Sequence, residues 1–237
     1  MVKIKTVLAI GAHPDDLELL CAGTLARYAE LGATVYLCHA TDGAKGGLDG
    51  DPENIREQRR VEADAAAAVI GAVSLAGPFR DGELETGLDS RRWMIDLIRH
   101  CAPDVVLAHH PHDYHPDHKA VSSLAMDAIY HVAIPHLITE HPALTSVPLL
   151  YFFDTVSGIG FLPEEYVDIS SVIDKKKRMM AAHASQLDFV RKHHKVDFID
   201  MIDTTGRYRG YQCNTQYAEG FIASQSWPRG TTQRVLP

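Results

Sequence analysis

Short apolar runs alternate with longer amphipathic segments through the first half of the chain. The apolar runs predict strands over residues 5–11, Thr34–His39, Val73–Ala76 and Asp104–Ala108. Apolar residues at helical spacing predict intervening helices over Asp16–Leu31, Ile55–Ile70, Arg91–His100 and Pro116 to about Tyr130. This repeated strand–helix order predicts an α/β fold with a doubly wound, mostly parallel sheet and right-handed crossovers.

The pattern changes after about residue 131. Pro135 and Pro142 interrupt residues 131–147 and Pro148 follows them, so we expect this segment to form a loop flanking the site. A strand is expected over Leu149–Val156 and a helix over Ile173–Gln186, so the sheet should carry a C-terminal strand/helix extension. The last thirty residues are expected to wrap the molecule as a tail or to meet a neighbouring subunit. Without any internal repeat or linker, residues 1–237 are expected to form a single domain.

Two of the predicted strands end in clusters of histidine and aspartate. The run Val7–Ile10 leads into Gly11-Ala-His-Pro-Asp-Asp16, and Val105–Ala108 leads into the histidine-rich segment 109–118. In a doubly wound sheet with strand order 3-2-1-4, the first and fourth strands are neighbours at the point where the order reverses. The two clusters are therefore expected to form one divided site.

The residue types in these clusters indicate a metal centre. Imidazole and carboxylate without thiolate suit zinc first, with iron, cobalt, manganese and nickel as competitors. His13 and Asp16 are three residues apart, as are His115 and His118, so either pair could face one ion from the start of a helix. Four candidates thus compete for about three ligand positions, and the remaining groups could act on a water and on a developing oxyanion.

Composition narrows the class of partner. The formal net charge of −8 argues against nucleic acid or an anionic membrane surface. No apolar run approaches the roughly 20 residues needed to span a bilayer, and the N-terminal residues lead directly into the first strand, so no signal peptide is expected. Four scattered cysteines are expected to be reduced, mostly core residues of a cytoplasmic protein: Cys21, Cys38, Cys101 and Cys213.

Several other features have ordinary explanations. His109, His110 and His112 are expected to be solvent-facing or to lie outside the ligand set. Gly43–Gly47 lacks the spacing of a Walker loop, and Gly11–Asp16 does not match the Gly-x-Gly-x-x-Gly pattern of dinucleotide sites, so neither predicts nucleotide binding. Residues 41–50 are instead expected to form a mobile loop over the substrate.

The paired motifs Ala12-His-Pro-Asp-Asp16 and His115-Pro-Asp-His118 resemble the signature of the PIG-L/LmbE-like zinc-dependent de-N-acetylase superfamily. Arg59-Arg-Val-Glu62 is similar to the helix motif of that family, and Phe79-Arg-Asp81 falls where its members carry a substrate-binding aspartate. Further similarities occur at Tyr166–Ile169, His183–Gln186 and Tyr217–Phe221. The resemblance implies a Rossmann-like fold and hydrolysis of an acetamido group, most often on an N-acetylglucosamine unit.

The resemblance also implies a set of ligands and binding residues. His13, Asp16 and His118 would bind Zn²⁺, or another divalent transition metal, with a water completing the coordination. Arg59 and Asp81 would bind substrate groups from the rim, with His183 and Gln186 as weaker candidates there.

Catalytic roles follow from the same resemblance. Asp15 would act as the general base and return the proton to the departing amine. His115, as imidazolium, would stabilise the oxyanion, and Asp117 would hold its ring and keep it charged.

The expected function is therefore removal of an acetyl group from a small soluble molecule by a metal-dependent hydrolase, with homo-oligomerisation left open. Two alternatives share the same site, namely an amidase of thiol conjugates and a hydratase of unsaturated acids. A non-enzymatic metal or ligand binder is disfavoured by Asp15, because a storage site has no use for an unliganded carboxylate.

Overall fold

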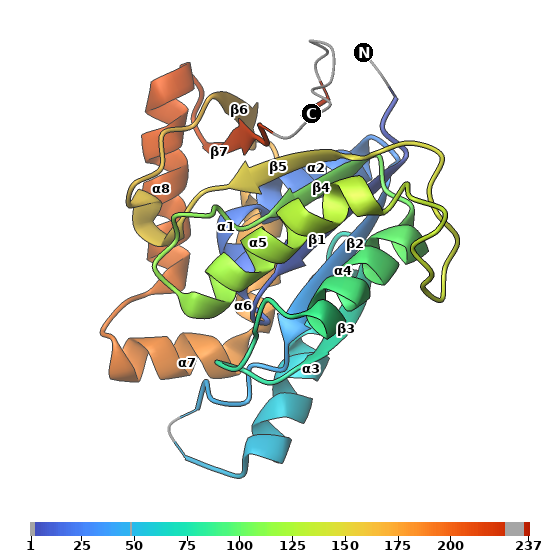
Figure 1. Cartoon of the computed structure of the whole chain (residues 1–237). Coiled ribbons are helices and arrows are strands. Elements are labelled where there is room, and N and C mark those ends of the chain that lie inside the picture. The colour runs from blue at the N-terminus through green and yellow to red at the C-terminus, as the bar shows by residue number, and fades with distance from the viewer. Residues whose placement is uncertain (1–2, 48, 226–234) are drawn as a thin grey trace.

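The computed structural model describes residues 3–47, 49–225 and 235–237, and its centre is a seven-stranded sheet with the order β3-β2-β1-β4-β5-β7-β6 (Figure 1). β1 pairs in parallel with β2 and β4, β2 with β3, and β4 with β5, whereas β7 pairs antiparallel with β5 and β6. The strands are β1 (Thr6–Gly11), β2 (Thr34–Thr41), β3 (Val73–Phe79), β4 (Val105–Ala108), β5 (Leu149–Phe153), β6 (Glu165–Asp168) and β7 (Ala218–Ala223). The predicted α/β fold and its 3-2-1-4 strand order are confirmed.

Helices cover both faces of the sheet. The helices are α1 (Asp16–Leu20), α2 (Ala22–Glu30), α3 (Pro52–Ala68), α4 (Leu88–Cys101), α5 (Pro116–His131), α6 (Ile173–Ala182), α7 (Ala184–His193) and α8 (Phe198–Cys213), with a short 3₁₀ helix η1 (Val156–Gly158). Successive residues of β1 point to opposite faces: Val7 and Ala9 join the core beneath α1, α2 and α6, whereas Leu8 and Ile10 join the core beneath α4 and α5. Figure 1 shows α4 and α5 lying across the near face of the sheet.

The first half of the chain follows its sequence pattern closely, and the second half departs from it. The helix expected over Asp16–Leu31 is interrupted at Cys21, and the helix beginning at Ile173 is interrupted at His183. The expected C-terminal tail contains the end of α8 and the strand β7, so residues 218–223 belong to the sheet instead of wrapping it. The rest of that expectation concerns residues 226–234, which lie outside the described part of the chain.

Buried polar contacts explain why β7 was missed. Glu219, the second residue of this strand, is buried and accepts hydrogen bonds from the backbone N–H groups of Gly23 and Thr24, at 2.9 and 2.7 Å. A further partner is Lys176 on α6, whose Nζ lies 2.5 Å from Glu219 Oε1. A charged residue in a buried strand breaks the apolar pattern from which strands are predicted, and only the tertiary contacts offset its burial.

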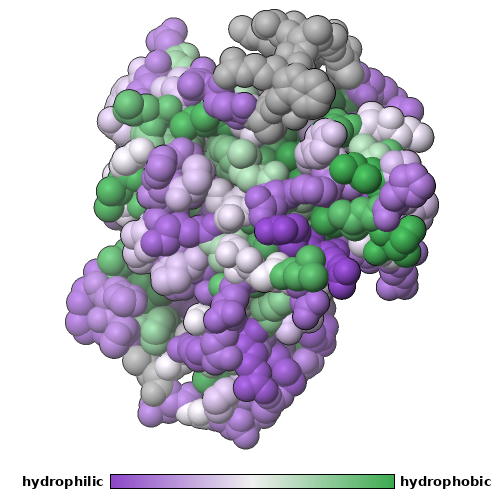
Figure 2. Space-filling view, viewed as in Figure 1, coloured by the Kyte–Doolittle hydropathy of each residue, from purple (hydrophilic) through white to green (hydrophobic). Residues whose placement is uncertain are grey.

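Two expectations from composition concern the cysteines and membrane-spanning helices. The four cysteines are free, and Cys21, Cys38 and Cys101 are buried, as expected. Among the described residues, no helix combines the length and the apolar character needed to cross a membrane. Figure 2 shows hydrophilic residues gathered over the lower part of this face, where α3 and α7 lie, with hydrophobic residues scattered in smaller groups above.

Candidate metal centre and active site

The site lies where β1 and β4 end side by side. Ile10 of β1 pairs with Ala108 of β4, so the chain segments that follow them, 11–16 and 109–118, leave the same edge of the sheet together. Each segment then turns into a helix, α1 at Asp16 and α5 at Pro116. The predicted meeting of the two motifs is therefore a direct consequence of strand order.

Asp16 is the centre of the cluster. Its Oδ2 accepts hydrogen bonds from the backbone N–H groups of Ala12 (3.0 Å) and His13 (2.7 Å), which fix the carboxylate. His13 Nδ1 lies 3.3 Å from Asp16 Oδ2, and His118 Nε2 lies 3.3 Å from Asp16 Oδ1. Burial acts to raise the pKa of Asp16, but the neighbouring His118, together with His109 and His13, holds it well below its usual range. His13 and His118 thus lie beside different oxygens of the Asp16 carboxylate.

The far nitrogens of the two histidine rings face carboxylates. His13 Nε2 lies 3.1 Å from Asp117 Oδ2 and 3.3 Å from Asp81 Oδ1, and His118 Nδ1 lies 3.1 Å from Asp113 Oδ1. A histidine that binds a metal through one nitrogen commonly has its other nitrogen oriented by a carboxylate. The donor set and its outer carboxylates therefore fit a divalent cation.

The surrounding charges also favour a cation at this point. Although burial acts to lower it, the Asp16 and Asp113 carboxylates raise the pKa of His118 to about 9. Burial likewise opposes charge on His13, yet Asp16 and Asp117 raise its pKa well above the usual value. A position at which carboxylates stabilise extra positive charge is suited to a metal ion, which would replace those protons.

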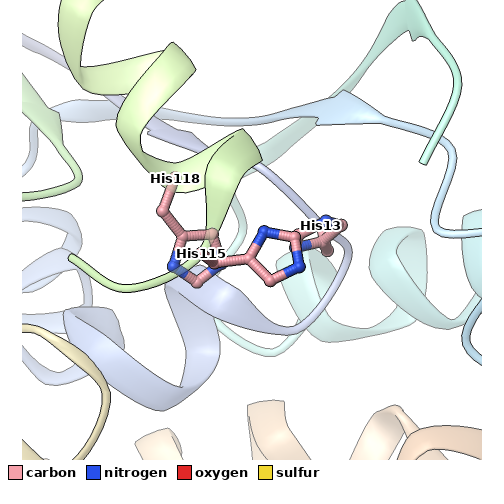
Figure 3. A group of neighbouring side chains, drawn as sticks. All are labelled: His13, His115 and His118. Carbon is pink, nitrogen blue, oxygen red and sulfur yellow. The ribbon is translucent and has the colours of Figure 1, made fainter. Parts of the chain in front are cut away.

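Figure 3 shows how the three histidines of the cluster are presented. His13 comes from the turn after β1, and His115 and His118 come from the start of α5, so that the rings lie together. The ring centroids are 4.7 Å apart for His13 and His115 and 5.4 Å apart for His13 and His118. These three form one group whose atoms could hold a metal, and Asp16, His109 and His118 form another.

Asp15 has the environment of a general base. It caps the N-terminus of α1 with φ of 126°, a value that non-glycine residues seldom adopt. Such strain persists only where the surrounding structure enforces it, and it is common in active sites. Burial raises the pKa of Asp15, and the Arg59 guanidinium, 3.3 Å away, opposes that rise.

The structure places Asp117 differently from the sequence-based expectation. Its carboxylate faces His13 and accepts a hydrogen bond from the backbone N–H of Gly82 (2.7 Å), and does not hold the His115 ring. The Asp117 backbone N–H donates to His115 Nδ1 at 3.2 Å, so the His115 side chain caps α5. The reason is the N-cap geometry, which points the ring of the capping residue back over the first helical turn.

The protonation expected for His115 is also not supported by its surroundings. Burial, with the positive charges of His13 and His118, lowers the pKa of His115. With Nδ1 accepting from the backbone, a neutral ring carries its proton on Nε2. His115 can then donate a hydrogen bond into the cleft without being an imidazolium.

Arg59 lies deeper than a rim residue. Its side chain is buried and donates to the carbonyl of Gly43 (2.9 Å) and to that of Pro14. It therefore ties α3 to the turn that carries Asp15 and to the loop after β2. Asp81 lies at the cleft, where its Oδ2 accepts a hydrogen bond from the backbone N–H of Lys45 (2.9 Å).

The loop after β2 is held at several points in its described part. Besides the Arg59 and Asp81 contacts, Gln186 Nε2 donates to the Gly46 carbonyl at 2.7 Å. The described part of the loop nearest the site is thus held by hydrogen bonds, and its mobility over the substrate stays a prediction. Lys45 and Gly46 line the cleft, as does Gln186.

Three buried residues of the site make contacts that the sequence did not predict. His109, expected to lie outside the ligand set, is fully buried, and its Nε2 lies 3.2 Å from Asp16 Oδ2. Burial and the charge on His118 lower the pKa of His109 to about 4, so it is neutral beside the cluster. Its position immediately after the buried strand β4 was the available signal.

The other two are Glu18 and His183, which form a pair. Both side chains are fully buried, and His183 Nε2 lies 3.4 Å from Glu18 Oε2. His183 therefore contacts α1 in the interior and does not lie at the rim of the substrate site. A carboxylate between two leucines of α1 was the signal for Glu18.

An open cleft of about 660 Å³ lies over these groups. Its floor includes the three predicted ligands and Asp15, together with His115 and Asp81. His109 does not line the cleft. An ion held by Asp16, His109 and His118 would therefore be turned away from the cleft, whereas one held by His13, Asp16 and His118 would face it.

Residues 8–129 match the family described as PIG-L, GlcNAc-PI de-N-acetylase, and this match covers half of the chain. The chain belongs to the PIG-L family. It is 28% identical to the diacetylchitobiose deacetylase of Thermococcus kodakarensis, over 92% of this chain and 82% of that protein. It is 26% identical to the 4-oxalmesaconate hydratase of Pseudomonas putida, over 77% of this chain and 74% of that one.

The fold of the family is shared as well. The structure of N,N'-diacetylchitobiose deacetylase from Pyrococcus horikoshii superimposes with a TM-score of 0.82 at 24% identity, covering 93% of this chain and 84% of that one. The Rossmann-like, LmbE-type arrangement implied by the resemblance is therefore confirmed.

Proposed function

We propose that this PIG-L family member is a metal-dependent hydrolase that removes the acetyl group from a small molecule carrying an N-acetylglucosamine unit. The observation that carries the proposal is Asp15, a buried carboxylate of raised pKa, beside the cluster of His13, Asp16 and His118 on the floor of one cleft. Family membership and the deacetylase among its relatives support the same reaction.

In this proposal His13, Asp16 and His118 hold a single Zn²⁺. The nitrogen and oxygen donors, the absence of thiolate among them and the carboxylates behind both rings support the assignment. A bound zinc would supply Lewis acidity, polarising the acetamido carbonyl and lowering the pKa of a water.

The protein's own groups would then move the proton and stabilise charge. Asp15 takes a proton from the attacking water and returns it to the departing amine, a task suited to a carboxylate whose pKa is raised. His115 donates from Nε2 to the oxygen on which negative charge develops. Asp117 orients the His13 ring, and Asp81 and Lys45 face the substrate at the edge of the floor.

The direct test measures amine release from acetamido sugars by purified protein. We expect about one divalent ion per chain by elemental analysis, loss of activity with a chelator and recovery with zinc. The Asp15→Asn variant is the matched control, because it should bind zinc like the wild type and release no amine. Protein without bound metal, or zinc affinity unchanged by His13→Ala, would contradict the assignment.

The hydratase relative gives a specific reason to test a second reaction. Attack of an activated water on an unsaturated acid could use the same cluster, and thiol-conjugate amides form a third substrate class. Both should be assayed with the same zinc-loaded protein, and preferential turnover of either would replace the deacetylase assignment. A cytoplasmic location and homo-oligomerisation stay predictions.

A further inference from the structure

A second group of histidine and carboxylate side chains lies away from the cleft, where α4 ends against residues 131–147. This segment connects the end of α5 to the start of β5, and Figure 1 shows it at the right of the view, on the side away from α7. Since α5 starts at the metal cluster and contains 16 residues, about 24 Å of helix separates the segment from the cluster. Residues 131–147, all of them described, therefore do not flank the site as expected, and none of them lines the cleft.

Three side chains of this group are linked from α4 to the segment and back to α4. Asp96 Oδ2 lies 3.0 Å from His141 Nδ1, and Asp96 Oδ1 accepts the backbone N–H of His141 at 2.8 Å. The other ring nitrogen of His141, Nε2, lies 3.0 Å from Nδ1 of His100. Although burial acts to raise it, the contacts with His141 lower the pKa of Asp96. The ionised carboxylate therefore accepts the Nδ1 proton, which leaves the His141 Nε2 lone pair facing His100.

The separation of the two rings fits a shared ion better than a shared proton. Their centroids are 4.7 Å apart, whereas a straight N–H···N hydrogen bond of the observed length would place them about 5.3 Å apart. An ion bound by both nitrogens at about 2.0–2.1 Å, with the two bonds at roughly 95°, reproduces the nitrogen and the centroid separations together. This angle is close to that between neighbouring ligands of square-planar Cu²⁺ or Ni²⁺, and smaller than the tetrahedral angle usual for Zn²⁺.

The surroundings hold the two histidines in place and favour positive charge between them. His100 belongs to the last turn of α4, where the helix carbonyls carry partial negative charge. The Asp96 carboxylate orients His141 from behind, as carboxylates commonly do for metal-binding histidines. The preceding residue, Arg99, fixes the segment through hydrogen bonds of 2.8–3.0 Å to three of its carbonyls, those of Val132, Ile134 and Leu137.

The pair is also accessible to an ion from solution. His100 is exposed, and the His141 side chain is 33% exposed. In the neutral form, His100 can carry its proton on Nε2, so that Nδ1 offers a lone pair beside that of His141 Nε2. Water would fill the remaining coordination positions of an ion held at this surface.

We propose that His100 and His141 bind a divalent transition metal, Cu²⁺ or Ni²⁺ in preference to Zn²⁺, at a second site separate from the catalytic cluster. The ion links residues 131–147 to the end of α4, so its binding stabilises the fold and takes no part in hydrolysis. Asp96 is a positioning residue, which orients the His141 ring and does not contact the ion. The inference does not depend on the proposed hydrolase function.

The experiment uses Ni²⁺ as the probe and untagged protein loaded with one equivalent of Zn²⁺. Calorimetric titration at neutral pH, followed by gel filtration and elemental analysis, measures both metals. We expect one Ni²⁺ per chain in addition to the zinc. His100→Ala and His141→Ala should lose the nickel and keep the zinc, which also shows that they are folded. His13→Ala should lose the zinc and keep the nickel, and Asp96→Asn should weaken nickel binding about 10-fold or more.

Two other exposed histidines provide matched controls. His136→Ala removes a histidine of the same segment. His193→Ala removes one of two neighbouring rings on and after α7, His193 and His194, whose centroids are likewise 4.7 Å apart. Both variants should bind nickel like the wild type. Ni²⁺ at a hundredfold excess over its dissociation constant should raise the Tm of the wild type by about 5 °C or more, and should not raise that of His141→Ala.

Three results would overturn the inference. The first is wild-type protein that binds no nickel beyond the zinc site. The second is a loss of nickel from either control equal to that from His100→Ala, because binding would then belong to surface histidines in general. The third is bound nickel that leaves Tm unchanged, because the ion would not link the segment to α4. None of these measurements uses amine release, so a failure of the hydrolase assignment would be distinguished from a failure of this site.

Discussion

At the scale of single residues, the site depends on two adjacent aspartates with opposite environments. Asp16 faces histidines that hold its pKa well below the usual range, whereas burial raises the pKa of Asp15. A carboxylate that stays ionised suits a metal ligand, and one with a raised pKa suits a base. Neighbouring carboxylates of the same type can therefore be assigned to different roles.

The two histidines of His115-Pro-Asp-His118 should respond differently to truncation. His118 Nε2 faces Asp16, so His118→Ala should lose zinc affinity and activity together. His115 caps α5 with Nδ1, so His115→Ala should keep zinc and lose roughly 10²–10³ in kcat, the usual cost of removing one oxyanion donor. Measurements of zinc content and kcat for the two variants check both expectations. If the His115 variant lost zinc and the His118 variant kept it, His115 would be the metal ligand and His118 the oxyanion donor.

The pH profile should report the contact between Arg59 and Asp15. A base must be deprotonated to act, so activity falls as the pH decreases through the pKa of Asp15. Because the Arg59 guanidinium holds that pKa down against burial, Arg59→Met should move the acidic limb of kcat to higher pH.

The control for this shift is Arg60→Met, since Arg60 is the exposed neighbour on α3 and pairs with Glu57 and Asp64. Its acidic limb should coincide with that of the wild type. An unshifted limb in a folded Arg59→Met protein would show that Arg59 does not act on the base.

At the scale of elements, α1 is held in place by buried charges beneath it. Glu18 on α1 lies 3.4 Å from His183, at the start of α7, and 3.7 Å from His39 on β2. Because Asp15 and Asp16 begin the same helix, contacts of Glu18 also position the catalytic turn. The interruption between α6 and α7 falls at His183, the residue that makes this contact.

The Glu18–His183 pair should give a defined dependence of stability on pH. Burial acts to raise the pKa of Glu18, but His183 and His39 lower it far below its model-peptide value of 4.5. Burial acts to lower the pKa of His183, but Glu18 raises it above 6.5. The contribution of Glu18 to the free energy of unfolding is lost as the pH falls below 4.5. The contribution of His183 is lost as the pH rises through the pKa of His183 in the folded protein.

Both residues therefore make their full contribution to stability between pH 4.5 and 6.5. Removing one partner of a buried pair costs about 3–5 kcal/mol, so His183→Ala should lower the free energy of unfolding most in this window. Urea unfolding at several pH values measures the difference from wild type. A difference that does not decline at higher pH would show that His183 is not charged in the folded protein.

At the scale of the whole molecule, the C-terminal part of the chain completes the sheet and the cleft. β7 lies between β5 and β6, and Glu219 on β7 joins it to α2 and α6. One side of the cleft is lined by residues of α7, of α8 and of the segment between them, in the same half of the chain, and the metal cluster comes from the first half. Stability and substrate binding thus both depend on how the two halves pack.

Two consecutive lysines of α6 provide a matched test of this packing. Lys176 is buried against Glu219, whereas Lys175 pairs with Glu30 at the surface. Lys176→Ala should lower the free energy of unfolding by about 3–5 kcal/mol, because it leaves a buried carboxylate unpaired. Lys175→Ala should change it by less than about 1 kcal/mol. Equal effects in urea unfolding would contradict the buried role of Lys176.

The sequence by itself determined the first half of the fold and the location of the site. Apolar runs with turn residues between them are local signals, so β1, β2, β3 and β4 were predicted within a few residues. The metal cluster followed from two motifs at strand ends, because parallel strands bring their carboxyl ends to one edge.

Only the tertiary structure decided which partner each polar group meets. β7 contains Glu219 and α1 contains Glu18, and both charges are tolerated because residues distant in sequence pair with them. Asp117 faces His13 instead of His115, since the N-cap geometry of α5 directs the neighbouring ring elsewhere. Hydrophobic periodicity is a property of neighbouring residues, whereas the pairing of buried charges depends on packing between segments far apart in the chain.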